Sequence, residues 1–93
     1  MFPKAVKEKA LFDADFKCER CGIPKAECQE GYLHIHHLLA VSCAIKYYPE
    51  IAPALVSCLA NAMVLCGECH KEMDDLAQTN HRHYAQALLA LTG

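Results

Sequence analysis

Two Cys-x-x-Cys pairs constrain this chain more than any other feature of its sequence. The pairs are Cys18-Glu19-Arg20-Cys21 and Cys66-Gly67-Glu68-Cys69. In each pair the backbone bends so that two sulfurs can reach one ion, and two such knuckles make the closed tetrahedral thiolate site of a structural zinc. Iron bound by four thiolates is the competing interpretation. Four ordinary buried cysteines would not explain two identical spacings.

The three remaining cysteines are interpreted from their surroundings. Cys43 and Cys58 lie in apolar segments and are predicted to be core residues. Cys28 lies close enough to the first knuckle to substitute as a ligand, but we do not expect it to bind the metal. Seven is an odd number of cysteines, and without a secretion signal it favours metal-bound thiolates in a reducing cytosol over a disulfide scaffold.

We expect neither a targeting segment nor a membrane span. The N-terminus is charged and has no uninterrupted apolar run, so no signal peptide is predicted and the protein is expected to be cytoplasmic. The most apolar stretch, residues 38–66, is interrupted by Lys46, Pro49, Glu50 and Pro53. It is therefore predicted to be a core segment rather than a membrane helix.

Length and composition predict one small globular domain. The 93 residues have no room for a second core, so residues 1–93 are expected to form one domain that needs a staple such as a metal. Apolar residues make up 54% of the chain and charged residues 22%, which argues against disorder. The net charge of −2 excludes a generic polybasic surface for nucleic acids and an electrostatic membrane anchor, although it is compatible with a local basic face.

Apolar periodicity and turn residues predict an α+β fold with few strands. Helices are expected over residues 3–14, 49–59, 67–77 and 80–91, with Asn80 capping the last of them. Strands are expected over residues 16–21, 32–38 and 62–65, where short runs of bulky residues are bounded by turn signals.

Histidines and an asparagine follow the first knuckle in a defined order. The segment Leu33-His34-Ile35-His36-His37-Leu38 ends a predicted strand, Asn61 begins the next strand, and His70 directly follows Cys69 at the start of a helix. Together with the helix-then-knuckle opening over residues 10–18, this order resembles the HNH endonucleases in their zinc-ribbon variety. The resemblance covers about residues 10–76, and residues 80–93 would form an accessory C-terminal helix.

The resemblance implies a ββα-metal core with flanking N- and C-terminal helices and one catalytic divalent cation (Mg²⁺, Mn²⁺, Ni²⁺ or Zn²⁺) beside the structural zinc. It implies that His36 and His70 bind this cation, that His37 is the general base, and that Asn61 ties the loop and orients the base. These groups suit phosphodiester hydrolysis, because a neutral imidazole can take a proton from water and a cation stabilises charge that develops on the phosphate.

Two further residues are possible ligands of the same cation. Asp74 follows His70 by four residues and shares its helical face, so it either completes the site or is a solvated acid beside Glu72 and Asp75. His34 is a rival first ligand. Side chains alternate along a strand, so His36 and His37 can serve one site only if the strand bends or ends there.

His81 and His83 are expected at the surface near a helix N-terminus, since their spacing is not distinctive of a metal site.

The expected partner is double-stranded DNA, which would be cut or only nicked. An acidic segment, residues 71–75, stands where a basic helix is expected, and early cationic residues could form one phosphate-facing surface. We therefore expect weak, salt-sensitive DNA binding, or dependence on a second copy of the chain or another DNA-binding partner.

Two other functional classes are compatible with the sequence. One is a catalytically silent zinc-ribbon module that binds nucleic acid or another partner, for which only the four cysteines matter. The other is an iron electron carrier, for which the histidines are incidental.

Overall fold

The computed structural model describes residues 2–91, and within them the chain forms five α-helices and one two-stranded sheet. The elements are α1 (Lys4–Asp13), β1 (His34–His37), α2 (Val41–Tyr47), α3 (Pro53–Val56), β2 (Ala62–Leu65), α4 (Gly67–Thr79) and α5 (His81–Ala90), with short 3₁₀ turns at Lys25–Glu27 and Leu59–Asn61. The predicted α+β class is confirmed. Among the helices of this described range, none is both long and apolar enough to cross a membrane.

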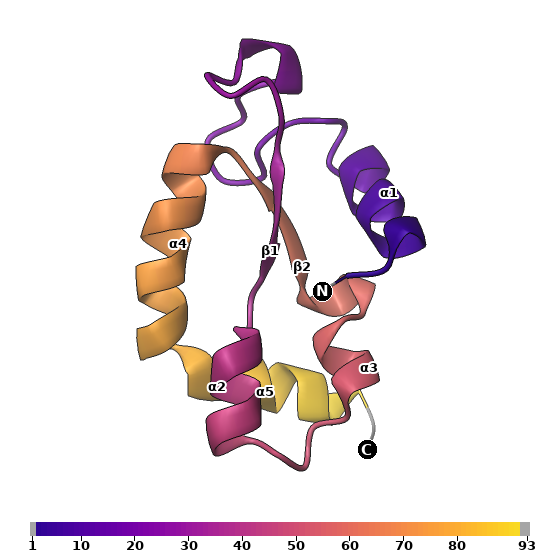
Figure 1. The fold of residues 1–93 in the computed structure, drawn as a ribbon, viewed down its shortest axis with the longest axis vertical. Helices are drawn as coiled ribbons and strands as arrows, with labels where there is room; N and C mark the ends of the chain where they lie inside the picture. Colours follow the sequence, from indigo (N-terminus) through magenta and orange to yellow (C-terminus); the bar gives the residue numbers. More distant parts are fainter. Residues whose placement is uncertain (1, 92–93) are drawn as a thin grey trace.

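The two strands lie at the centre of the molecule and are flanked by helices (Figure 1). β1 and β2 are antiparallel, with His34 opposite Leu65 and His37 opposite Ala62. In Figure 1, α4 runs along one side of the strands and α1 lies on the other side, where it packs on β2. Val64 and Leu65 of β2 are fully buried between these layers.

A first apolar core surrounds the sheet. It is built from α1, β2, α4 and the first knuckle, and its members are Ala10, Cys18, Leu33, Val64, Leu65, Cys66, Cys69 and Met73. Three of the four knuckle cysteines therefore belong to this core. A core this small is expected to need additional stabilisation, which a metal ion bound by these sulfurs would provide.

The predicted strand over residues 16–21 is wrong. Asp15 and Phe16 have positive φ angles of 57° and 54°, and the chain then turns through the first knuckle. Extended backbone would point neighbouring side chains to opposite faces, whereas two sulfurs that share one ion need a curled backbone. Within the segment, Lys17 forms an isolated antiparallel bridge with Pro24. Glu19 contacts β2: its N–H donates to the Val64 carbonyl and its Oε1 accepts from the Val64 N–H, both at 2.8 Å.

A second apolar core lies at the other end of the molecule, where α2, α3 and α5 meet. It contains Leu39, Cys43, Ala44, Ile51, Val56, Ala85 and Leu88, with Cys58 packed against it. The assignment of Cys43 to the core is thereby confirmed, and Cys58 is half-buried at the edge of the core.

The single helix predicted over residues 49–59 is wrong, since α2 ends at Tyr47 and α3 begins only at Pro53. Pro49 disfavours helical backbone at the residue before it, and Pro53 is suited to the first position of a new helix. Asn80 is the N-cap residue of α5, as predicted, but its side chain makes no capping hydrogen bond. It is also the residue at which α4 ends.

Candidate metal centres

The four knuckle cysteines form one cluster, as the sequence predicts. Their Sγ atoms all lie within 4.8 Å of one another, and the Sγ atoms of Cys21 and Cys66 are 3.7 Å apart. A tetrahedron with metal–sulfur bonds of about 2.3 Å has sulfur–sulfur edges of about 3.8 Å. All seven cysteines are free thiols. The cluster is therefore compatible with a structural metal site.

Local backbone bonds build the first knuckle. The N–H of Cys21 donates to Cys18 Sγ at 3.5 Å, and the N–H of Cys18 donates to the Ile23 carbonyl at 2.9 Å. Gly22 closes the turn with a bond from its N–H to the Cys18 carbonyl at 2.9 Å, and its φ of +82° favours glycine at this position. The spacing of the pair thus follows from a tight turn that brings both sulfurs to one side.

The second knuckle uses the start of a helix. Cys66 is the N-cap of α4, Cys69 lies in the first turn, and the N–H of His70 donates to the Cys66 carbonyl at 2.9 Å. An ion pair between Arg20 of the first knuckle and Glu72 of α4 joins the two halves of the cluster. The cysteine cluster therefore connects an early loop to the helix that carries His70.

The cluster favours bound cations electrostatically. Burial opposes ionisation of Cys18, but hydrogen bonds with the backbone of Cys21, Cys66 and Arg20 lower its pKa to about 6. Burial and the neighbouring sulfurs raise the pKa of Cys69 to about 12. A dication among the sulfurs would offset the repulsion between thiolates and draw all four into the deprotonated form.

A second cluster contains His36, His70 and Asp74. One ligand atom from each lies within 4.8 Å of the others. His36 Nδ1 is 3.4 Å and His70 Nε2 is 3.5 Å from the same carboxylate oxygen, Asp74 Oδ1. β1 contributes one imidazole, and one face of α4 contributes the other imidazole and the carboxylate.

This donor set fits a divalent cation. Two imidazoles and a carboxylate suit first-row divalent ions, and three protein ligands leave further positions open. His36 is only 3% exposed, whereas the Asp74 side chain is 58% exposed, so the cluster has a buried side and a solvent side. The Nε2 atom of His36 is buried and has no hydrogen-bond partner among the side chains and backbone that the structure describes.

His37 lies apart from this cluster. β1 ends at His37, which pairs with Ala62, and no bend within the strand turns the His36 and His37 side chains to the same face. The His37 ring stacks on Phe2, with ring centroids 3.8 Å apart and an interplanar angle of 10°. Burial lowers the pKa of His37 to about 4, which keeps the imidazole neutral at physiological pH.

Asn61 ties together the chain that follows His37. Its Oδ1 accepts from the Leu39 N–H at 2.8 Å, and its Nδ2 donates to the carbonyls of Leu39 at 3.1 Å and Val56 at 2.8 Å. Asn61 is 1% exposed, so these bonds are shielded from water. The side chain therefore fixes the loop after β1, and it does so through the backbone rather than through the His37 ring.

The other sequence candidates lie outside both clusters. His34 lies next to the second cluster, where its Nδ1 is 3.0 Å from His70 Nδ1. The Cys28 thiol donates to the Pro24 carbonyl at 3.5 Å. His81 packs on two tyrosines, with its Nδ1 2.7 Å from the Tyr48 hydroxyl.

Sequence reasoning missed two residues, Phe2 and Glu30, that contact these histidines. Phe2 is 4% exposed and covers one face of His37. Glu30 lies 3.2 Å from His34 and was not singled out, because it belongs to a loop without apolar periodicity. Outside a helix, a spacing of four residues does not predict contact between two side chains. Glu30 contacts His34 because the loop turns back toward β1.

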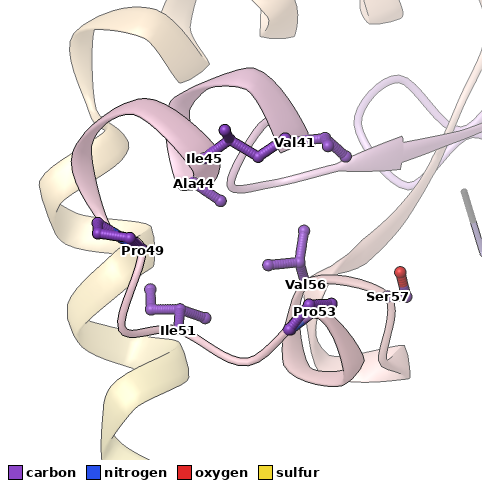
Figure 2. Close-up of a pocket in the computed structure, with 8 residues that line it drawn as sticks. All are labelled: Val41, Ala44, Ile45, Pro49, Ile51, Pro53, Val56 and Ser57. Carbon is purple, nitrogen blue, oxygen red and sulfur yellow. The ribbon is translucent and has the colours of Figure 1, made fainter.

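A separate hollow of about 390 Å³ lies in the second core (Figure 2). Side chains of α2, α3 and the segment between them line it, and Ser57 is the one polar residue among the eight. None of the eight is a candidate ligand, so this hollow is distinct from both clusters.

No family model, curated protein or solved structure matches the chain.

Proposed function

We propose that this protein is a metal-dependent endonuclease or nickase of the HNH type, which hydrolyses phosphodiester bonds of DNA. The convergence of His36 from β1 with His70 and Asp74 from α4 carries the proposal. This strand–strand–helix arrangement is the one that the resemblance to HNH endonucleases implies. In this proposal β1, β2 and α4 form the ββα-metal core, and the four-cysteine cluster is its structural zinc site.

His36, His70 and Asp74 would hold the cation and leave its remaining positions to water and a phosphate oxygen. When bound, a divalent cation supplies stabilisation of the negative charge that develops on the phosphate and on the leaving 3′ oxygen. The exposed Asp74 side of the cluster is where a phosphate can approach. The buried His36 side would exclude water from behind the cation.

His37 is the proposed general base. An imidazole accepts a proton only in its neutral form, and a pKa lowered to about 4 by burial keeps His37 neutral throughout the physiological range. The Phe2 stack limits rotation of the ring, and Asn61 fixes the backbone at Leu39, two residues further on. Both contacts would hold the base in one orientation. As the resemblance to HNH endonucleases implies, water would attack and the 3′ oxygen would leave, so the products would carry 5′-phosphate and 3′-hydroxyl ends.

One observation favours the second candidate function, a catalytically silent zinc-ribbon module that binds nucleic acid or another partner. Phe2 covers a face of His37, and His37 Nε2 is buried without a hydrogen-bond partner among the described residues. A base enclosed in this way meets water less readily than an open one. In that case only the four-cysteine cluster would matter to function.

A plasmid-nicking assay distinguishes the two candidates. Supercoiled plasmid is incubated with zinc-loaded protein and Mg²⁺, Mn²⁺, Ni²⁺ or added Zn²⁺ in turn. We expect nicked circles with at least one cation, and we expect loss of nicking in His36→Ala protein. His83→Ala is the matched control, because His83 is exposed and contacts only the ring of Tyr84 among the described aromatic contacts. Folded, zinc-loaded wild type that nicks with none of the cations would contradict the nuclease proposal.

A further inference from the structure

A chain of polar contacts leads from the loop before β1 to the second cluster. Glu30 Oε1 lies 3.2 Å from His34 Nε2, and His34 Nδ1 lies 3.0 Å from His70 Nδ1. On its other side, His70 Nε2 faces Asp74 Oδ1 at 3.5 Å. The two nitrogens of His70 therefore face different partners, with Nδ1 toward His34 and Nε2 toward the cluster.

The chemistry of the three groups fixes where their protons lie. An ionised carboxylate only accepts hydrogen bonds, so His34 must donate to Glu30 from Nε2. A neutral His34 then has a lone pair on Nδ1, and it can only accept the hydrogen of His70 Nδ1. His70 is left with its lone pair on Nε2, the atom that faces Asp74. With Glu30 ionised and both histidines neutral, one carboxylate would set the tautomers of both histidines.

Two features hold Glu30 in place. The Tyr32 hydroxyl donates to its second oxygen, Oε2, at 2.8 Å. Gly67, the first residue of α4, leaves space for the carboxylate, because a Cβ atom at that position would clash with Glu30 Oε1. Gly67 belongs to the second knuckle, so the loop that carries Glu30 lies beside this knuckle.

We propose that Glu30 and His34 are positioning residues that set the tautomer of His70 and thereby keep its Nε2 lone pair available to a divalent cation. This inference rests on the proposed cation site at His36, His70 and Asp74. It gives His34, the rival ligand, a different task from metal binding. Partners that orient a ligating histidine are typically worth about 10–100-fold in metal affinity.

Ni²⁺ binding to the zinc-loaded full chain provides the test, measured by calorimetry with the zinc content determined before and after. His34→Phe keeps a ring but removes both nitrogens, and we expect it to weaken Ni²⁺ binding by about 10–100-fold. His34→Gln offers a carbonyl oxygen to His70 Nδ1–H and should restore part of the affinity. Glu30→Ala should lose affinity, whereas Glu27→Ala, an exposed acid of the same loop, should not.

A second readout reports the tautomer without any added cation. The ¹⁵N chemical shifts of the His70 ring should show a protonated Nδ1 and an unprotonated Nε2 in the wild type, and a mixture of tautomers in His34→Phe. This measurement separates proton placement from a general loss of packing.

The possible failures are distinguishable. Wild type that binds no Ni²⁺, or His70→Ala protein that binds it as tightly as wild type, would contradict the cation site itself. If His70→Ala abolishes binding while His34→Phe and Glu30→Ala bind like wild type, the site stands and the positioning role is wrong. If His34→Gln is as weak as His34→Phe, the effect comes from packing, and the positioning role is again wrong.

Discussion

His36 Nδ1 and Asp74 Oδ1 lie 3.4 Å apart, although one belongs to a buried position of β1 and the other to an exposed position of α4. The same carboxylate oxygen lies 3.5 Å from His70 Nε2. Asp74 is thus the common neighbour of both imidazoles. The sequence left open whether Asp74 is a ligand or a solvated acid, and this relationship favours the ligand.

Asp74→Ala should weaken the binding of a second, exchangeable divalent ion by at least about tenfold, equivalent to about 1.4 kcal/mol. The neighbouring Asp75→Ala is the matched control, because Asp75 is exposed and lies outside the cluster. Ni²⁺ calorimetry on zinc-loaded protein measures both. Equal affinities for the two variants would mean that Asp74 is only a solvated acid.

Cys66→Ser, or removal of the metal by a chelator at neutral pH, should abolish cooperative unfolding or lower the melting temperature sharply. Structural zinc contributes about 10 kcal/mol or more to the folding of small zinc domains, and three cluster cysteines belong to the first core. Cys28→Ser, outside the cluster, should change the melting curve little. Mass spectrometry should find one tightly held zinc, and the protein should be colourless. An unchanged melting curve after the metal is removed would contradict a structural role.

Asn61→Ala should destabilise the fold strongly. The change leaves three buried backbone groups of Leu39 and Val56 without their partner. Each such group costs about 1–3 kcal/mol, so we expect a total loss of about 3 kcal/mol or more. At about 4 °C per kcal/mol for a domain of this size, the melting temperature falls by about 12 °C or more. Asn80→Ala is the control, since the Asn80 side chain caps neither helix. An equal fall in melting temperature for Asn80→Ala would contradict the stabilising role of the Asn61 hydrogen bonds.

Stability should fall as the pH drops from about 6.5 toward 4. Burial lowers the folded-state pKa of His37 from 6.5 to about 4 and also lowers that of His36. In this window the unfolded chain binds protons that the folded chain does not, so acid favours unfolding. His37→Gln removes this titrating group, so it should reduce the pH dependence of stability relative to wild type. Both proteins lose cysteine-bound metal in acid in the same way, so the difference between their pH profiles reports on His37. Identical pH profiles for the two proteins would contradict a buried neutral His37.

Some of these elements follow directly from local sequence. β2 has the predicted bounds of 62–65, because a short apolar run stands between Asn61 and the second knuckle. The four-cysteine cluster was predictable because each Cys-x-x-Cys spacing brings two sulfurs together locally, and two such pairs can share one metal ion. The 49–59 prediction failed because apolar spacing was read across Pro53, which begins a helix rather than continuing one.

Other relationships depend on tertiary packing and have no local signal. Glu30 meets His34 only because its loop folds against α4 at Gly67. The Phe2 ring reaches His37 because α1, which follows Phe2, packs on β2 and holds the start of the described chain beside the sheet. The alternation of side chains that separates His36 from His37 was predictable from the sequence, but where β1 ends is visible only in the folded strand.

The most direct test of the proposed nuclease activity is the nicking rate of His37→Ala protein that has been shown to retain its fold, its zinc and its binding of Ni²⁺ and DNA. Removing a positioned acid–base group typically slows a reaction by about 10²–10⁴-fold, and we predict a loss of this size on supercoiled plasmid with each active cation. If His37→Ala nicks as fast as wild type, His37 is not the general base, and the proposed mechanism is wrong.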